Sequence, residues 1–190
     1  STTEDFHDRL FGNFVTSSLA DYWAEVSRGA FRVSGAVAGW YYLHGAQADY
    51  ARGGPLGDEG LFPDSPGGLV AHAVAAADSA VDFGLFDNDG PDGIPNSGDD
   101  DGVVDALIVV HTGGDAAAGD ADNLWSHTGR LGGNAVATGD SAAGGGTIVV
   151  DQYSLLPELA GNGSTPVVSD IGVYCHELGH QLGLVDLYPA

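Results

Sequence analysis

Two short amphipathic stretches open the chain, and each follows residues that can cap a helix. Thr2 or Thr3 can cap a helix that continues to about Leu10. Ser17 or Ser18, with an aspartate at capping-box spacing, can open a second helix that ends near residue 29. The pattern therefore predicts that the N-terminal segment is helical.

Beyond these helices, the pattern alternates between strand, loop and helix signals. Residues 31–43 carry alternating apolar positions followed by Trp-Tyr-Tyr, and they predict two strands. Residues 44–67 are rich in Gly, Pro and Asp and predict a loop. The Ala-rich stretch Gly68–Val81 predicts a helix that packs on a sheet.

Residues 103–157 supply the strongest strand signal and two Gly-rich gaps. The apolar run within Val103–His111 predicts a central strand. Gly-rich loops are expected at 112–122 and 129–146, and Thr147–Tyr153 predicts a further strand. No repeat and no linker interrupts the pattern, so we expect one unit of the α/β (α+β) class with long loops. Loops of this length are often functional or bind metal.

A last helix is predicted from about residue 170 to 182, with Ser169 or Asp170 as its N-cap. At about 100° per residue, four apolar side chains gather on one side of this helix: Ile171, Cys175, Leu178 and Leu182. We expect that side to pack into the core and the opposite side to face a cleft.

The opposite side carries a sequence of the form H-E-x-x-H-x-x-G-x-x-D. His176 and His180 are four residues apart, so they share one helical face and can bind one metal ion. Glu177 can take a proton from a metal-activated water. Gly183 can end the helix in a left-handed conformation, and the chain can then bring Asp186 round as a third ligand. Three protein ligands and one open position are typical of catalytic zinc, whereas an ordinary buried helix would only hydrogen-bond its two histidines.

Composition narrows the classes of function. The chain has 190 residues, no lysine, 5 arginines and 27 acidic residues, which give a net charge of -22. Nucleic acids and anionic membrane surfaces would be repelled, so neither is an expected partner. No apolar run approaches the roughly 18 residues that span a membrane. The chain starts at Ser1 and contains no methionine, so we expect a processed or excised piece of a protein.

The only cysteine, Cys175, precludes an internal disulfide. It precedes the first histidine of the motif, where it could be a fourth ligand or a redox switch. Because it falls on the apolar side of the helix, we interpret it as a small buried hydrophobic residue.

A second candidate metal site lies in the acidic stretch 87–105, where seven aspartates alternate with Gly and Pro. Calcium takes 6–8 oxygen ligands, and a bound cation would relieve the repulsion between these carboxylates. The spacing is not that of an EF-hand, because no glutamate closes a 12-residue loop. The alternative is a solvated acidic loop. The candidate calcium ligands are Asp87, Asp89, Asp99, Asp101 and Asp105.

Two further histidines are ambiguous. His111 ends the expected central strand and could reach a cleft, but such a residue is more often hydrogen-bonded in the core, and the role of His127 stays open. Serine and histidine occur together without a nucleophile-elbow motif, so nothing favours a serine hydrolase.

With these motifs the chain resembles the immune inhibitor A family of secreted bacterial metallopeptidases, in the metzincin clan. The resemblance rests on several segments: Asp21 to Phe31, the acidic loop that runs into Val103–His111, Trp125 to His127, Tyr153 to Glu158 and His176 to Tyr188. It implies a metzincin-like zinc peptidase domain, with a mixed twisted sheet and an active-site helix. It also implies that His176, His180 and Asp186 bind Zn²⁺ and that Glu177 is the catalytic base. Secretion, Ca²⁺ stabilisation and protein or peptide substrates are implied as well.

The chain departs from the family pattern at both ends. Members have an initial strand before the position of Ser1 and a Met-containing turn beyond the third ligand, whereas this chain stops at Ala190. We therefore expect residues 1–190 to be a single, partial metallopeptidase catalytic domain. Two alternatives stay open. One is a different zinc hydrolase, such as an amidase, and the other is a calcium-dependent extracellular binding module with an incomplete zinc site.

Overall fold

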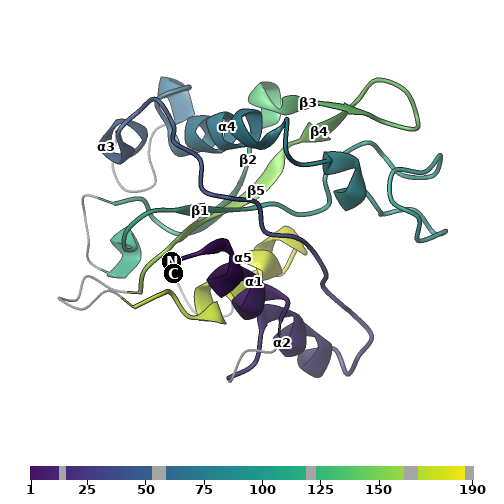
Figure 1. Ribbon diagram of the computed structural model, residues 1–190, viewed down its shortest axis with the longest axis horizontal. Coiled ribbons are helices and arrows are strands. Elements are labelled where there is room, and N and C mark those ends of the chain that lie inside the picture. Colours follow the sequence, from purple (N-terminus) through teal and green to yellow (C-terminus); the bar gives the residue numbers. More distant parts are fainter. Residues whose placement is uncertain (13–15, 53–58, 119–122, 161–166, 187–190) are drawn as a thin grey trace.

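A mixed β-sheet with helices on both faces forms the computed structural model of the chain (Figure 1). The structure describes residues 1–12, 16–52, 59–118, 123–160 and 167–186. One face of the sheet is covered by α4 (Pro66–Ala77), and the other by α1 (Thr3–Leu10), α2 (Leu19–Val26) and α5 (Ile171–Gln181). The arrangement confirms the predicted mixed α/β (α+β) class. None of the helices in the described residues is long and apolar enough to cross a membrane.

Both N-terminal helices begin at capping boxes, which were predicted at α2 and only as a simple N-cap at α1. Thr2 caps α1, and its hydroxyl accepts a hydrogen bond from the Asp5 N–H while the Asp5 carboxylate accepts one from the Thr2 N–H. Ser18 and Asp21 make the same reciprocal pair at the start of α2. Each box satisfies two backbone donors that a helix N-terminus otherwise leaves unpaired.

The sheet is organised around β5 (Gln152–Pro157). Its neighbours are β1 (Ile108–His111), which runs parallel, and β2 (His127–Arg130), which runs antiparallel. A hairpin of β3 (Val136–Ser141) and β4 (Thr147–Val150) continues the sheet, because only one residue separates β4 from β5. Val103 forms a parallel β-bridge with Val149 of β4. The segment that leads into β1 therefore lies beside β4, and β1 itself lies beside β5.

Three strand predictions are wrong in detail. The regular strand in Val103–His111 is only β1, and it pairs with β5 on one side instead of lying centrally. The central position belongs to β5, and the single strand predicted at Thr147–Tyr153 is replaced by β4 and β5. The predicted loop 129–146 contains the end of β2 and all of β3, whose small and polar residues give no apolar alternation. Pairing with β4, which the sequence pattern does not encode locally, makes this segment a strand.

The two strands predicted at residues 31–43 are absent from the structure. Residues 31–43 have no regular secondary structure and pair with none of the strands of the described chain. Val33 and Val37 still pack against the core on the α5 side, which explains their alternation, while the Tyr42 side chain is fully exposed. Side-chain burial, and not sheet pairing, produced the pattern.

The predicted helix Gly68–Val81 is confirmed as α4, which starts earlier, at Pro66 after the Ser65 cap, and ends at Ala77. The predicted loop 44–67 contains the short helix α3 (Gln47–Tyr50) and a 3-10 turn at Glu59–Leu61, and its residues 53–58 lie outside the described chain. The predicted loop 112–122 contains a 3-10 turn at Ala116–Ala118, and residues 119–122 also lie outside it.

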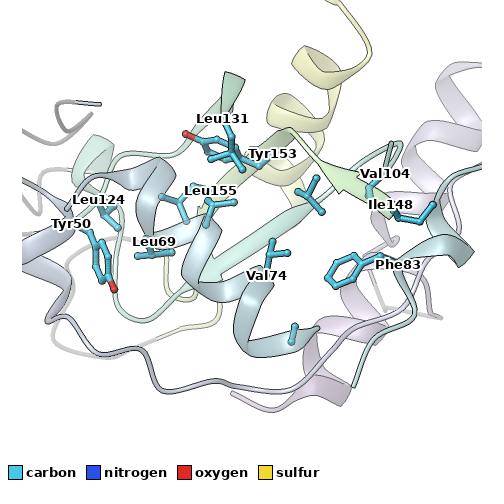
Figure 2. Close-up of a cluster of buried hydrophobic side chains, with 13 residues drawn as sticks. Tyr50, Leu69, Val74, Phe83, Val104, Leu124, Leu131, Ile148, Tyr153 and Leu155 are labelled. Carbon is cyan, nitrogen blue, oxygen red and sulfur yellow. The ribbon is translucent and has the colours of Figure 1, made fainter. Parts of the chain in front are cut away.

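Two hydrophobic clusters hold the helices to the sheet. On the α4 side, Leu69 and Val74 of the helix pack against Ile148, Tyr153 and Leu155 (Figure 2). On the other side, Leu156 of β5 packs against Tyr174 and Leu178 of α5 and against residues of α1 and α2. Since successive side chains of β5 point to opposite faces, one strand serves both clusters and fixes α5 against the sheet.

Candidate metal centre

Helix α5 presents His176 and His180 on the side away from the core. Ile171, Cys175 and Leu178 pack against the sheet and the N-terminal helices, as predicted. Leu182 does not: its side chain is exposed, because the helix ends at Gln181 and Leu182 is already the C-cap. Asp170 is the N-cap, but its side chain makes no capping hydrogen bond.

The turn after α5 is a Schellman motif, and it is what returns the chain toward the histidines. Gly183 has φ +83°, the left-handed conformation expected from the sequence. Its N–H donates to the His180 carbonyl, and the Leu184 N–H donates to the Gly179 carbonyl, both at 2.9 Å. The reversal leaves Asp186 beside the helix face that carries the two histidines.

His176, His180 and Asp186 converge on one point. The two histidine Nε2 atoms are 3.2 Å apart. Asp186 Oδ1 lies 3.4 Å from each of them. Zinc with bonds of about 2.0–2.1 Å in a tetrahedral arrangement separates its ligand atoms by roughly 3.3 Å. The three atoms therefore form a triangle whose edges fit a tetrahedral zinc ion.

The orientation of His180 is fixed from the other side of its ring. His180 Nδ1 lies 2.9 Å from the Leu184 carbonyl oxygen, which only accepts hydrogen bonds, so Nδ1 carries the proton. This tautomer leaves Nε2 unprotonated, with its lone pair directed toward Asp186 and His176. A backbone carbonyl behind a metal-binding histidine is a common outer partner in such sites.

Glu177 is buried next to the triangle. Its side chain is 5 % exposed, and Oε1 lies 4.0 Å from His176 Nε2. The Thr128 hydroxyl of β2 lies 2.9 Å from Oε2 and 2.8 Å from the Glu177 carbonyl oxygen. Thr128 could not be identified from the sequence, because it is 49 residues away from Glu177 and belongs to no motif. Only the pairing of β2 with β5 places it there.

The acidic loop brings together three of its five candidate ligands. Carboxylate oxygens of Asp87, Asp89 and Asp105 lie within 4.8 Å of one another. Asp99 and Asp101 are not in this group. Asp99 accepts hydrogen bonds from the Ser97 hydroxyl and the Asp92 N–H, and Asp101 Oδ1 accepts one from the Val103 N–H at 2.9 Å.

Asp87 is the unusual member of this cluster, because it is 1 % exposed and its Oδ1 has no hydrogen-bond partner. Its Oδ2 accepts a hydrogen bond from the Gly102 N–H at 3.1 Å. Burial, followed by the neighbouring charge of Asp100, raises the pKa of Asp87, and burial also raises the pKa of Asp105. An unpaired buried carboxylate is costly unless a cation or a proton accompanies it. The Asp87, Asp89 and Asp105 cluster therefore has the chemistry of an oxygen-donor cation site.

The two ambiguous histidines both lie away from the triangle. His111 is 5 % exposed, its Nδ1 lies 3.0 Å from the Thr112 carbonyl, and burial lowers its pKa. His127 Nδ1 lies 2.8 Å from the Trp125 carbonyl, and its Nε2 lies 3.2 Å from the Tyr153 hydroxyl on the α4 side of the sheet. We therefore interpret both as hydrogen-bonded histidines and not as ligands of a metal at the α5 centre.

Cys175 is buried, as predicted from its place on the apolar side of α5. Burial raises the pKa of its thiol to about 11, so it is protonated near neutral pH. A protonated thiol within an apolar cluster fits a small hydrophobic residue and neither a metal ligand nor a redox switch.

Comparison with known proteins places this chain in a family. The chain matches the family described as immune inhibitor A peptidase M6, catalytic domain, over residues 2–190, and it belongs to that family. One relative is immune inhibitor A of Bacillus thuringiensis subsp. alesti, which is 34% identical over 183 residues, or 90% of this chain. Another is the pre-pro-metalloprotease PrtV of Vibrio cholerae serotype O1 (strain M66-2), 30% identical over 189 residues, or 93% of this chain. The chain spans 25% and 19% of the lengths of these relatives. Membership in the family implies a bound metal.

Proposed function

We propose that the protein is a zinc-dependent endopeptidase whose metal ligands are His176, His180 and Asp186. The observation that carries this proposal is the triangle of ligand atoms with edges of 3.2–3.4 Å beside a buried glutamate. Membership in a peptidase family supports it independently of the geometry. Leu187 and Tyr188, which contribute to the family motif, lie outside the described residues.

Glu177 is the general base of this proposal. Zinc at the triangle would supply Lewis acidity that polarises the scissile carbonyl and makes water easier to deprotonate. The Glu177 carboxylate takes the proton from the attacking water and delivers it to the departing amine nitrogen. Its burial excludes bulk water that would compete for that proton, and the Thr128 hydrogen bond keeps one carboxylate oxygen in place.

Protein or peptide bonds are the proposed substrates, and an amidase acting on small molecules is the competing hydrolase. The names of the two relatives support the peptidase, since one is called a metalloprotease and the family is one of peptidases. Hydrolysis of a folded or unfolded protein substrate and of a panel of small amides separates the two. Internal cleavage of protein with no release from small amides is the expected result.

We also propose that Ca²⁺ binds at Asp87, Asp89 and Asp105. The unpaired, buried Oδ1 of Asp87 supports a cation there, and an all-oxygen set favours calcium over zinc. The solvated acidic loop is the competing interpretation, but it does not explain why one carboxylate of the cluster is buried. Of the five candidate ligands, Asp99 and Asp101 are left out because only the carboxylate oxygens of Asp87, Asp89 and Asp105 gather within 4.8 Å of one another.

The proposed location is extracellular. One relative is named a pre-pro-protein, a form that carries segments for export and activation. Millimolar calcium outside cells would also load a weak site of the kind proposed at the acidic loop. Recovery of the protein from culture medium, against a cytoplasmic marker enzyme in the same fractions, tests this location. Nucleic acid is excluded as a proposed partner by the net charge of -22.

The deciding experiment is Glu177→Gln, with Glu25→Gln as its matched control on the exposed face of α2. Glu177→Gln should abolish peptide hydrolysis while elemental analysis still finds one zinc per chain. Glu25→Gln should keep both. Undiminished hydrolysis by the Glu177 variant would refute its role as base. A parent protein that binds zinc and calcium but hydrolyses nothing would instead favour the calcium-dependent binding module.

A further inference from the structure

A polar layer lies between α5 and the sheet, where the surrounding contacts are apolar. Leu156, Tyr174 and Leu178 are buried in this interface, yet Ser154 of β5 is 0 % exposed in the middle of it. Gln181 of α5 and Thr128 of β2 contact Ser154 from either side. Burying hydroxyl and amide groups costs free energy unless they are hydrogen-bonded, so the layer calls for an explanation beyond packing.

The layer is a connected chain of hydrogen bonds that ends at Glu177. The Gln181 side-chain amide donates to the Leu107 carbonyl at 3.0 Å and to the Ser154 hydroxyl at 2.6 Å. Ser154 and Thr128 hydroxyl oxygens are 2.8 Å apart. The Thr128 hydroxyl then reaches Glu177 at Oε2 and at its carbonyl oxygen.

The donor and acceptor types give this series of hydrogen bonds a single direction. Leu107 offers only a carbonyl oxygen, so the Gln181 atom that faces it is the NH₂ group, which can only donate. At the other end, an ionised carboxylate and a carbonyl can only accept, so Thr128 donates to Glu177. Ser154 must therefore donate to Thr128. Hydrogen bonds aligned in this way polarise one another and strengthen the last one.

We propose that Thr128 is a positioning residue for Glu177, supported by Ser154 and Gln181. The inference rests on the proposed function, because it assigns Thr128 a role through the base of that reaction. One hydroxyl proton lies within reach of both the backbone and the carboxylate of Glu177, so it ties the side chain to its own helix turn. Thr128 is suited to this because a β-branched side chain has few χ1 rotamers and β2 is held in register with β5. Fixing a reacting group before the reaction lowers the cost of reaching the transition state.

Steady-state kinetics of the complete protein give the first test. Thr128→Val keeps the shape and removes the hydroxyl, so kcat should fall about ten- to hundredfold, the loss expected for one hydrogen bond to a charged group. KM and zinc content should stay within about threefold of the parent. Thr128→Ser restores the hydroxyl and should recover most of the loss. The matched control is Thr138→Val in β3, a buried threonine whose hydroxyl donates to the Ile148 carbonyl at 3.0 Å, and kcat should be unchanged there.

A second measurement needs no turnover. In protein labelled with ¹³Cδ-glutamate, the Glu177 resonance is the one that Glu177→Gln removes. Thr128→Val should shift this resonance at constant pH in the metal-free protein, and Thr128→Ser and Thr138→Val should not. A resonance and a kcat that Thr128→Val leaves unchanged would overturn the positioning role. If the parent protein hydrolyses nothing but Thr128→Val still shifts the Glu177 resonance, the contact between Thr128 and Glu177 is upheld and only the proposed peptidase function is contradicted.

Discussion

The two proposed metal sites are built by opposite means. At α5, two ligands come from adjacent turns of one helix and the third follows a turn closed by Gly183, so all three lie within 11 residues. In the acidic loop, Asp87 and Asp105 are separated by 17 intervening residues without regular structure beyond a few turns. The helix sets its ligand spacing by its own period, whereas the loop depends on how its ends are held.

This difference separates what a metal contributes at each place. The α5 triangle has edges that fit zinc, and its ligands come from one helix and the turn that follows it. The loop cluster carries a buried, unpaired carboxylate oxygen, so the fold is less stable there until a cation or a proton joins it. We therefore expect zinc to act mainly on activity and calcium mainly on stability.

The largest expected effect is on zinc retention. Asp186→Asn keeps the size of the third ligand and removes its charge, so zinc affinity should fall more than about a hundredfold. Loss of a residue that only hydrogen-bonds to a metal ligand typically weakens metal affinity by about 10–100-fold, and loss of a ligand should cost more. Asp170→Asn at the start of the same helix is the control, because its carboxylate makes no cap. A competition titration against a chelator measures both variants. Equal affinities would remove Asp186 from the ligand set.

Calcium should raise the stability of the protein substantially. At about 100 times its dissociation constant, it would add roughly 2.7 kcal/mol to the free energy of unfolding. Thermal melting with and without a calcium-selective chelator, at constant zinc, measures the gain. Asp87→Asn should abolish most of it and Asp99→Asn should not. A gain that survives Asp87→Asn but disappears with Asp99→Asn would place the ion elsewhere in the loop.

The calcium gain should also depend on pH. Because burial raises the pKa of Asp87 and Asp105, these groups hold protons more tightly in the folded chain without calcium than in the unfolded chain. Their contribution to stability is therefore present below about pH 3.8 and is lost as pH rises through the raised pKa. Calcium restores it, so the melting difference should be greater at pH 7 than near pH 4. A melting difference that does not change with pH would mean that calcium does not bind at these two carboxylates.

Gly183→Ala tests the turn that completes the α5 site. A side chain at φ +83° costs about 1–2 kcal/mol, and any relaxation of the turn moves Asp186 away from the histidines. Gly172→Ala in the first turn of the same helix is the control, because a Cβ there meets no atom within 4 Å. It should leave stability unchanged or raise it by up to about 1 kcal/mol. Chemical denaturation and zinc titration of both variants decide whether the turn matters for the metal.

The smallest expected effect is a coupling between the two sites. Val103 of the acidic loop forms a bridge to β4, and the chain then continues into β1. Strand β1 pairs with β5 beneath α5. Removing calcium should therefore weaken zinc binding severalfold, within the 1–3 kcal/mol typical of coupled sites, and removing zinc should weaken calcium binding by the same factor. Zinc titrations at high and negligible calcium measure it. Identical affinities would mean that the two sites are independent.

The same contrast explains how far sequence reasoning reached. The N-caps of the two N-terminal helices, and the helix that carries His176 and His180, were predicted because their signals are local. β3 was not, because its small and polar residues show no apolar alternation. The position of β5 between β1 and β2 was not either, because it depends on segments far apart along the chain. Thr128 was missed for the same reason. In the acidic loop, composition indicated a cation site, but only the folded structure shows that Asp105 belongs to the carboxylate cluster and Asp99 does not.

The near-continuous line of β4 and β5 has a further consequence for local opening of the molecule. It contributes side chains to the cores on both faces, and β1, β2 and β3 all pair with it. Its amide protons can exchange with solvent only when both cores separate, so their exchange should report global unfolding. The turn at 182–186 is exposed and follows the last helical residue, so its amides should exchange through fraying alone. The strands that support the proposed metal-binding helix and the turn that follows this helix thus lie at opposite ends of the range of local stability.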